Sequence, residues 1–252
     1  VHPGDVFLLN DPYAGGSHLP DVTAFVPIFL GSELAFWAIN RAHHSDIGGA
    51  TYGAYNAAAR EIWQEGLRLP PIRFYDKGVM RRDVLRMLKA NVRHARDFEG
   101  DLSAQIGSVL LAERRVQALA KEFDRDTIAA AITTILDATE DQTRENIAGW
   151  TDGTYVGEAL LDDDGRGNQD ILIRARVTVS GSDLTVDLRD CAPQVNSFVN
   201  SPPANTRSAV IVALSVLLDA GIAKNEGMVR PLTILTREGT IVAPHPGAPV
   251  TM

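Results

Sequence analysis

Apolar side chains recur with a helical period in the middle of the chain. Between residues 101 and 123 they lie three or four positions apart, which places them on one face of a helix. The same spacing predicts a shorter helix over residues 83–92 and a third helix over residues 126–148. In the third helix, the side chains expected to point inward are Ile128, Ile132, Ile135 and Leu136. The pattern therefore predicts a helical block with other structure on either side.

Before this block, apolar positions are typical of strands. Residues 4–9, 22–30 and 33–40 are rich in Val, Ile, Leu, Phe and Trp, and the segment "GSE" between the last two predicts a β-hairpin. Pro27 cannot donate a backbone hydrogen bond, so its strand is expected to lie at a sheet edge or to carry a bulge. A further short strand is expected near residues 72–75.

After Gly149 the apolar positions alternate again. The segments "TYVGEALL", "ILIRARVTVS", "LTVDLRD" and "PLTILTR" predict four strands, and the run "AVIVALSVLL" predicts a buried helix at residues 209–218. This order of elements indicates an α+β fold with mixed or antiparallel sheets and a central helical block. We expect a hairpin region over residues 1–80, the helical block over 81–149, and a β-rich region with one buried helix over 150–252.

Composition narrows the class of protein. With 45% hydrophobic and 22% charged residues, the chain can bury a sizeable core, and its net charge of -8 argues against a nucleic-acid or anionic membrane surface. Residues 60–96 depart from this balance with ten Lys or Arg against four Asp or Glu, which fits either a solvated face or a partner surface. Cys191 is the single cysteine, which indicates a reducing, cytoplasmic setting. The longest apolar run is too short to cross a bilayer, so no membrane span is expected.

Residues that bind metals cluster at the two ends of the predicted hairpin. His18 and Asp21 lie in the turn "GGSHLPD" before its first strand, and a pair of histidines, His43 and His44, follows its second strand. A three-residue loop would place Asp21 opposite His43. A two-residue loop would shift the register by one and bring His44 or Ala42 there instead. Two imidazoles and a carboxylate suit Zn²⁺, Fe²⁺ or Mn²⁺, with positions left open for water and substrate.

Spacing alone also allows a structural interpretation of these residues. His18 would cap a turn, the paired histidines would end a strand, and the aspartates would serve loops. Asp11 and Asp46 are candidate catalytic carboxylates that could orient an imidazole or relay a proton. No segment matches a phosphate-binding loop or a dinucleotide fingerprint, so any ATP is expected to bind elsewhere.

Six segments follow one another along almost the whole chain: "GDVFLLNDPYAGGSHLPDVTAFVPIF", "NRAHHSDIGG", "EGLRLPPIRFYDKG", "GDLSAQIG", "CAPQVNSFVNSP" and "TRSAV". Together they resemble the hydantoinase B/oxoprolinase family, the B or beta subunits of N-methylhydantoinases, 5-oxoprolinases and caprolactamase-like enzymes. Subunits of acetone and acetophenone carboxylases are more distant relatives. The resemblance implies a fragment of a larger subunit, in keeping with a chain that begins at Val1 and stops at the loop-like "PHPGAPVTM".

The resemblance also implies a site and a reaction. A divalent metal would be bound by His18 and Asp21 of the "HLPD" turn and by His43 of the "AHH" segment. A hydantoinase A/oxoprolinase-type ATPase subunit would bind ATP and phosphorylate the amide oxygen of a small cyclic amide, and the metal would supply hydroxide for hydrolysis. The expected protein is therefore a hetero-oligomeric hydrolase. One alternative is a subunit of an ATP-dependent ketone carboxylase. The other is a non-catalytic scaffold for the ATPase, and the presence of three metal-binding residues argues against this scaffold.

Overall fold

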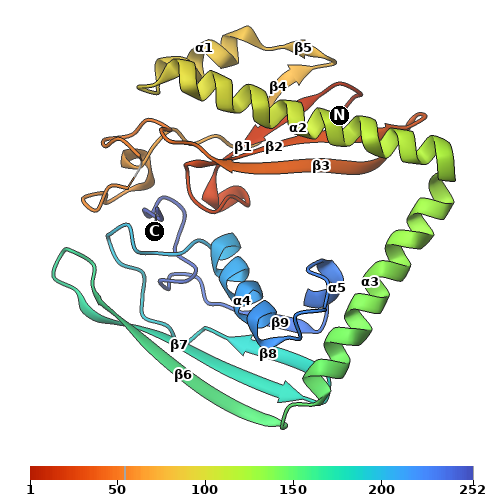
Figure 1. The fold of residues 1–252 in the computed structure, drawn as a ribbon. Helices are drawn as coiled ribbons and strands as arrows, with labels where there is room; N and C mark the ends of the chain where they lie inside the picture. Colours follow the sequence, from red (N-terminus) through yellow and green to blue (C-terminus); the bar gives the residue numbers. More distant parts are fainter. Residues whose placement is uncertain (54, 252) are drawn as a thin grey trace.

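The computed structural model describes residues 1–53 and 55–251. It contains two lobes, each built on one sheet, which are connected along one side by a long helix (Figure 1). The sheet of the first lobe has strand order β3-β2-β1-β4-β5, and the sheet of the second has order β6-β7-β8-β9. The α+β fold with antiparallel and mixed sheets that the sequence predicts is confirmed.

The first lobe comprises residues up to the end of the second helix. Its strands are β1 (Val6–Leu9), β2 (Asp21–Leu30), β3 (Glu33–His43), β4 (Ile72–Asp76) and β5 (Val79–Met80). Its helices are α1 (Arg82–Ala90) and α2 (Ala95–Phe123), together with the short 3-10 helices η1 (Pro12–Ala14) and η2 (Ile62–Gln64). Helix α2 lies across one face of the sheet (Figure 1).

The core of the first lobe lies between this face and α2. Every second residue of β2 from Val22 to Ile28 belongs to this core, and these residues are Val22, Ala24, Val26 and Ile28. The predicted apolar stripe of α2 meets them through Leu102, Ile106 and Val109. Farther along the helix, Leu119 and Phe123 are exposed. The stripe therefore packs on the core as far as Val116 and leaves the last turns of the helix exposed.

Strand β2 contains Pro27 and lies inside the sheet, between β3 and β1. Its pairing with β1 ends at Phe25, so Pro27 lies beyond that ladder and the missing N–H group interrupts none of its bonds. A bulge lies between Ile28 and Phe29. Of the two alternatives predicted for this strand, the edge position is wrong and the bulge is confirmed.

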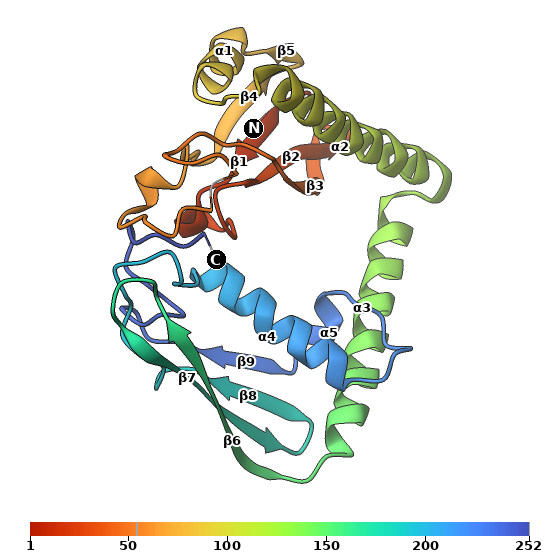
Figure 2. The ribbon, with the colours of Figure 1, turned by 60° about the vertical axis from the view of Figure 1, so that its left-hand side comes forward.

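The second lobe follows the connecting helix α3 (Arg125–Ala148). Its strands are β6 (Gly153–Asp163), β7 (Gln169–Ser180), β8 (Asp183–Asp187) and β9 (Leu232–Leu235), and its helices are α4 (Pro203–Leu217) and α5 (Glu226–Val229). Strands β8 and β9 pair in parallel, whereas the other pairs are antiparallel. Helix α4 lies over one face of this sheet (Figure 2). None of the helices in the described part of the chain is both long and apolar enough to span a membrane.

Two burial predictions for the helices are wrong. The segment at residues 209–218 is not a buried helix, because Val212, Val216 and Leu217 of α4 are each more than half exposed. In α3, Ile132 and Ile135 are exposed, and the buried residues are Thr139, Thr143 and Ile147. The physical reason is the same for both helices: each has one covered face, and α3 meets the second lobe through its second half. The helices of the predicted central block are accordingly divided between two cores.

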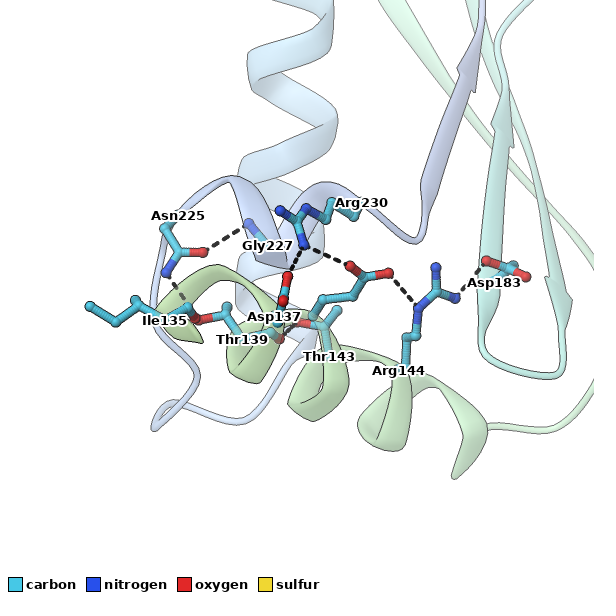
Figure 3. Close-up of polar contacts among 10 residues, drawn as sticks. Ile135, Asp137, Thr139, Thr143, Arg144, Asp183, Asn225, Gly227 and Arg230 are labelled. Carbon is cyan, nitrogen blue, oxygen red and sulfur yellow. Dashed lines mark hydrogen bonds and ion pairs between the residues drawn. The ribbon is translucent and has the colours of Figure 1, made fainter. Parts of the chain in front are cut away.

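An ion-pair network attaches the second half of α3 to the second lobe (Figure 3). Arg230, just after α5, donates to Asp137 at 2.7 Å and to Glu140 at 3.0 Å. Arg144 lies one turn after Glu140 and donates to it and to Asp183, both at 2.8 Å. Because these side chains are partly exposed, each pair is weak in isolation. Together they fix the helix against both α5 and the β7–β8 turn.

Helix α5 approaches α3 most closely at Gly227, where a Cβ atom would lie 2.1 Å from the Leu136 carbonyl oxygen. We expect Gly227→Ala to lower the free energy of unfolding by about 1–3 kcal/mol, because α5 must move away from α3. Gly221→Ala in the same connection is the matched control, since nothing lies within 4 Å of its Cβ position. Chemical denaturation measures both variants, and equal stabilities would contradict the close approach.

Candidate metal centre

The β2–β3 hairpin brings the end of one strand to the start of the other. Its loop has two residues, Gly31 and Ser32, and not the three that the favoured register requires. The bulge between Ile28 and Phe29 adds one residue to β3, which restores that register. Asp21 therefore lies opposite His43, the partner predicted for a three-residue loop, although the loop has two residues.

Three side chains converge at this end of the hairpin. Nε2 of His18 and Nδ1 of His43 each lie 2.9 Å from Oδ1 of Asp21, and the two ring nitrogens are 3.3 Å apart. One ligand atom from each residue lies within 4.8 Å of the others. Ligands about 2.0–2.1 Å from a tetrahedral Zn²⁺ are themselves about 3.3 Å apart. The spacing of the two nitrogens thus fits one edge of a metal coordination sphere.

The electrostatics of the site favour an anionic Asp21 beside His18. Burial alone would raise the pKa of Asp21, but hydrogen bonds from His18 and Ser17 outweigh it and hold that pKa below its usual range. Burial would lower the pKa of His18, but its hydrogen bonds to Asp21 and to the Thr251 carbonyl raise it. The contact between His18 and Asp21 therefore favours an anionic carboxylate at the point where the three side chains meet.

The second ring nitrogen of His18 determines which nitrogen faces the site. Nδ1 lies 3.0 Å from the carbonyl oxygen of Thr251. A carbonyl oxygen only accepts hydrogen bonds, so Nδ1 carries the proton and donates it to this oxygen. In a neutral ring, the lone pair is then on Nε2, which points toward Asp21 and His43. Histidine ligands commonly hold their other N–H group in this way.

The neighbouring His44 lies on the opposite side of the sheet. Its ring is buried against Phe98 of α2, and Nε2 lies 3.1 Å from Oε1 of Gln105. Since successive side chains of a strand alternate between faces, His43 and His44 cannot both reach Asp21. The register with His44 at the site is therefore wrong.

The two candidate catalytic carboxylates lie in arginine ion pairs. Oδ2 of Asp11 is 2.8 Å from Nε of Arg68, and Oδ1 of Asp46 is 3.0 Å from a guanidinium nitrogen of Arg93. Among the described residues, neither carboxylate hydrogen-bonds to an imidazole. No contact in the structure supports their predicted role in orienting a histidine, and Thr251 has that contact instead.

Comparison with known protein families matches residues 1–252 to hydantoinase B/oxoprolinase. The chain belongs to this family. Over 250 residues it is 36% identical to caprolactamase subunit beta of Pseudomonas jessenii, which covers 99% of this chain and 43% of that subunit. It is 30% identical to 5-oxoprolinase of Saccharomyces cerevisiae over 265 residues, covering 99% of this chain and 20% of that enzyme. The chain thus spans less than half the length of these hydantoinase B/oxoprolinase relatives.

Solved structures share the fold of this hydantoinase B/oxoprolinase chain. The crystal structure of ATP-dependent caprolactamase from Pseudomonas jessenii superposes with a TM-score of 0.95 at 35% identity, covering 100% of this chain and 44% of that one. A nucleotide-free acetone carboxylase structure gives a TM-score of 0.88 at 19% identity, with 97% and 34% covered. At so low an identity, the second likeness shows the fold alone.

Sequence reasoning missed the residues that surround the three converging side chains. Ser17 donates to Oδ2 of Asp21, and Asn10 donates to the backbone of both Leu19 and Leu67, which holds the "HLPD" turn in place. Thr251 lies 233 positions from His18, so no local pattern could indicate their contact. The contact of Ser17 could have been predicted from the sequence, because a hydroxyl next to a turn that carries a metal ligand can hydrogen-bond to a carboxylate of that turn.

The ion pairs of Asp11 and Asp46 yield a test of their role. We expect Asp11→Asn and Asp46→Asn each to lower the free energy of unfolding by about 1–3 kcal/mol, because an arginine loses its charged partner, and to leave metal affinity unchanged. Asp141→Asn, an exposed carboxylate of α3, should be neutral. Denaturation and metal titration give both quantities. A stable Asp11→Asn protein that binds metal but has lost turnover would restore the catalytic role.

Proposed function

We propose that this chain is part of the metal-dependent subunit of an ATP-dependent cyclic amide hydrolase, with His18, Asp21 and His43 as metal ligands. The observation that carries the proposal is the convergence of their three ligand atoms at the end of one hairpin. The printed names of the relatives, caprolactamase subunit beta and 5-oxoprolinase, supply the substrate class, which is lactams and related cyclic amides. Zn²⁺, Mn²⁺ and Fe²⁺ all suit this set of donor atoms.

The proposed reaction divides the work between two subunits. An unstrained amide resists attack by water, and transfer of a phosphoryl group from ATP to its oxygen would make the carbonyl carbon more electrophilic. Water would add to that carbon, and the ring C–N bond would break with a proton passing to nitrogen, which leaves an amine and an acyl phosphate. A second water would then release inorganic phosphate and the carboxylate. No phosphate-binding loop is recognisable in this sequence, so we assign ATP to a partner ATPase subunit of the hydantoinase A type. The designation of the relative as a beta subunit supports such a partner. When bound here, a divalent ion would supply an acidified water for attack at the carbonyl carbon.

The three ligands contribute in different ways. Asp21 brings negative charge, and its low pKa keeps it ionised at neutral pH. The His18 side chain is only 16% exposed and is bonded through both nitrogens, so its orientation is fixed. The His43 side chain is 49% exposed. Water and substrate would therefore approach from the side of His43.

The two alternatives receive less support. A ketone carboxylase subunit would have the same fold, but the likeness to acetone carboxylase extends to the fold alone. A non-catalytic scaffold has no use for two imidazoles and a carboxylate at hydrogen-bonding distance from one another. Both alternatives predict results that differ from those of a cyclic amide hydrolase.

His18→Ala in the full-length subunit, assembled with its ATPase partner, tests the proposal. We expect ATP-dependent ring opening of lactams, hydantoins or 5-oxoproline to fall by at least about 100-fold with loss of bound metal, because removing a ligand costs more than the 10–100-fold of an outer-shell change. Nucleotide binding by the partner should be unchanged. Product formation and metal content are measured together.

The matched control is His245→Ala, which removes an exposed histidine paired with Glu238 and should leave ring opening intact. Near-normal ring opening in a metal-free His18→Ala complex would favour the scaffold. Consumption of CO₂ with a ketone, in place of ring opening by the unmodified complex, would favour the carboxylase.

A further inference from the structure

Glu65 is a fully buried carboxylate in the loop that follows η2, with 0% of its surface exposed. Its oxygens accept the backbone N–H of Val250 at 2.9 and 3.1 Å and that of Thr251 at 3.0 Å. Among the residues that the structure describes, it forms no ion pair with Lys or Arg. Burial raises its pKa, in spite of these hydrogen bonds. Burying a carboxylate without an ion-pair partner is costly, so a role in the neighbouring site would explain its position.

The contacts of Thr251 connect this carboxylate to the proposed metal centre. The N–H group of Thr251 donates to Glu65, and the carbonyl of the same residue accepts the Nδ1 proton of His18. Val250, on the other side of the peptide bond, packs into the core of the first lobe. Glu65 thus holds the residue that sets the orientation and the tautomer of His18.

The backbone around Glu65 is itself held firmly. Its N–H group donates to the carbonyl of Ile62, and Ala50 donates to the carbonyl of Gln64. Gly49 packs so closely that a Cβ atom there would lie 2.7 Å from the Glu65 carbonyl oxygen. The carboxylate is therefore presented from a rigid segment, which is what a positioning group requires.

We propose that Glu65 is a positioning residue for metal binding: by holding Val250 and Thr251 it fixes His18 with Nε2 directed at the ion. The inference rests on the proposed metal-binding function of His18, Asp21 and His43. It differs from a purely structural role, in which Glu65 would stabilise the fold and leave the metal affinity unchanged.

Titration of the metal-free full-length subunit with Zn²⁺ and Co²⁺ tests the proposal. Glu65→Gln keeps the size of the side chain, but one of its two ends becomes an NH₂ group. In either orientation of the amide, at least one of the hydrogen bonds from Val250 and Thr251 is replaced by a contact between two donors, which loosens this segment. We expect the Kd for metal to rise about 10–100-fold, as for other residues that orient a ligand. Glu65→Asp keeps an acceptor with a shorter reach and should give an intermediate Kd. The absorption spectrum of bound Co²⁺ should change in Glu65→Gln, because the imidazole of His18 is no longer held.

Asp5→Asn is the matched control. Asp5 is another buried carboxylate of the first lobe, and it accepts the backbone N–H groups of His2 at 2.8 Å and Lys77 at 2.9 Å. Its loss should lower the melting temperature, as the loss of Glu65 does, and should leave the Kd and the Co²⁺ spectrum unchanged.

The outcomes separate this inference from the proposed function. If the unmodified subunit binds neither metal at micromolar concentration, the proposed metal centre is wrong and the role of Glu65 is lost with it. If the unmodified subunit binds metal and Glu65→Gln binds it with the same Kd and spectrum, only the positioning role is overturned. Should Glu65→Gln fail to fold, a folded Glu65→Asp protein with an unchanged Kd overturns that role equally.

Discussion

The geometry of the candidate metal centre depends on the register of the β2–β3 hairpin. If the register slipped by one residue, His44 or Ala42 would lie opposite Asp21 in place of His43. The slip is opposed by the core, since it would turn apolar side chains of the hairpin away from α2. Burying a side chain such as Val22, Val26 or Ile28 contributes about 1.5–3 kcal/mol to stability. The bulge lets a two-residue loop coexist with this register. The packing that stabilises the first lobe therefore also aligns two of the three proposed ligands.

The rest of the site comes from segments that are distant in the sequence. Asn10 holds the turn that carries His18, and Glu65 holds Thr251, whose carbonyl meets the far side of the same imidazole. These connections are backbone hydrogen bonds to buried side chains, which resist motion better than contacts between exposed side chains. The sheet supplies Asp21 and His43, and loops that are hydrogen-bonded to the first lobe fix the position of His18.

Among the residues that the structure describes, the segment after β9 is the part of the chain beyond α3 that reaches the centre. After β9 the chain returns to the first lobe, where Tyr13 donates to the Ala248 carbonyl and Val250 enters the core. Helix α3, attached by the Arg144 and Arg230 ion pairs, connects the lobes on the other side. Connections on both sides constrain how the lobes lie relative to each other, and this allows Thr251 to stay against His18.

The sequence by itself determined the elements and the hairpin pair. Strand and helix periods are local, and Asp21 belongs to the same hairpin as His43. Spacing left His43, His44 and Ala42 open as partners of Asp21, and the family motif indicated His43. Only the tertiary structure decided that Ile135 and Val216 are exposed, because a helix face is buried only where another element covers it. It also decided that Glu65 holds Thr251, a contact across 186 positions. Hydrogen bonds between such distant segments leave no periodic trace in a single sequence, because they depend on how the lobes pack.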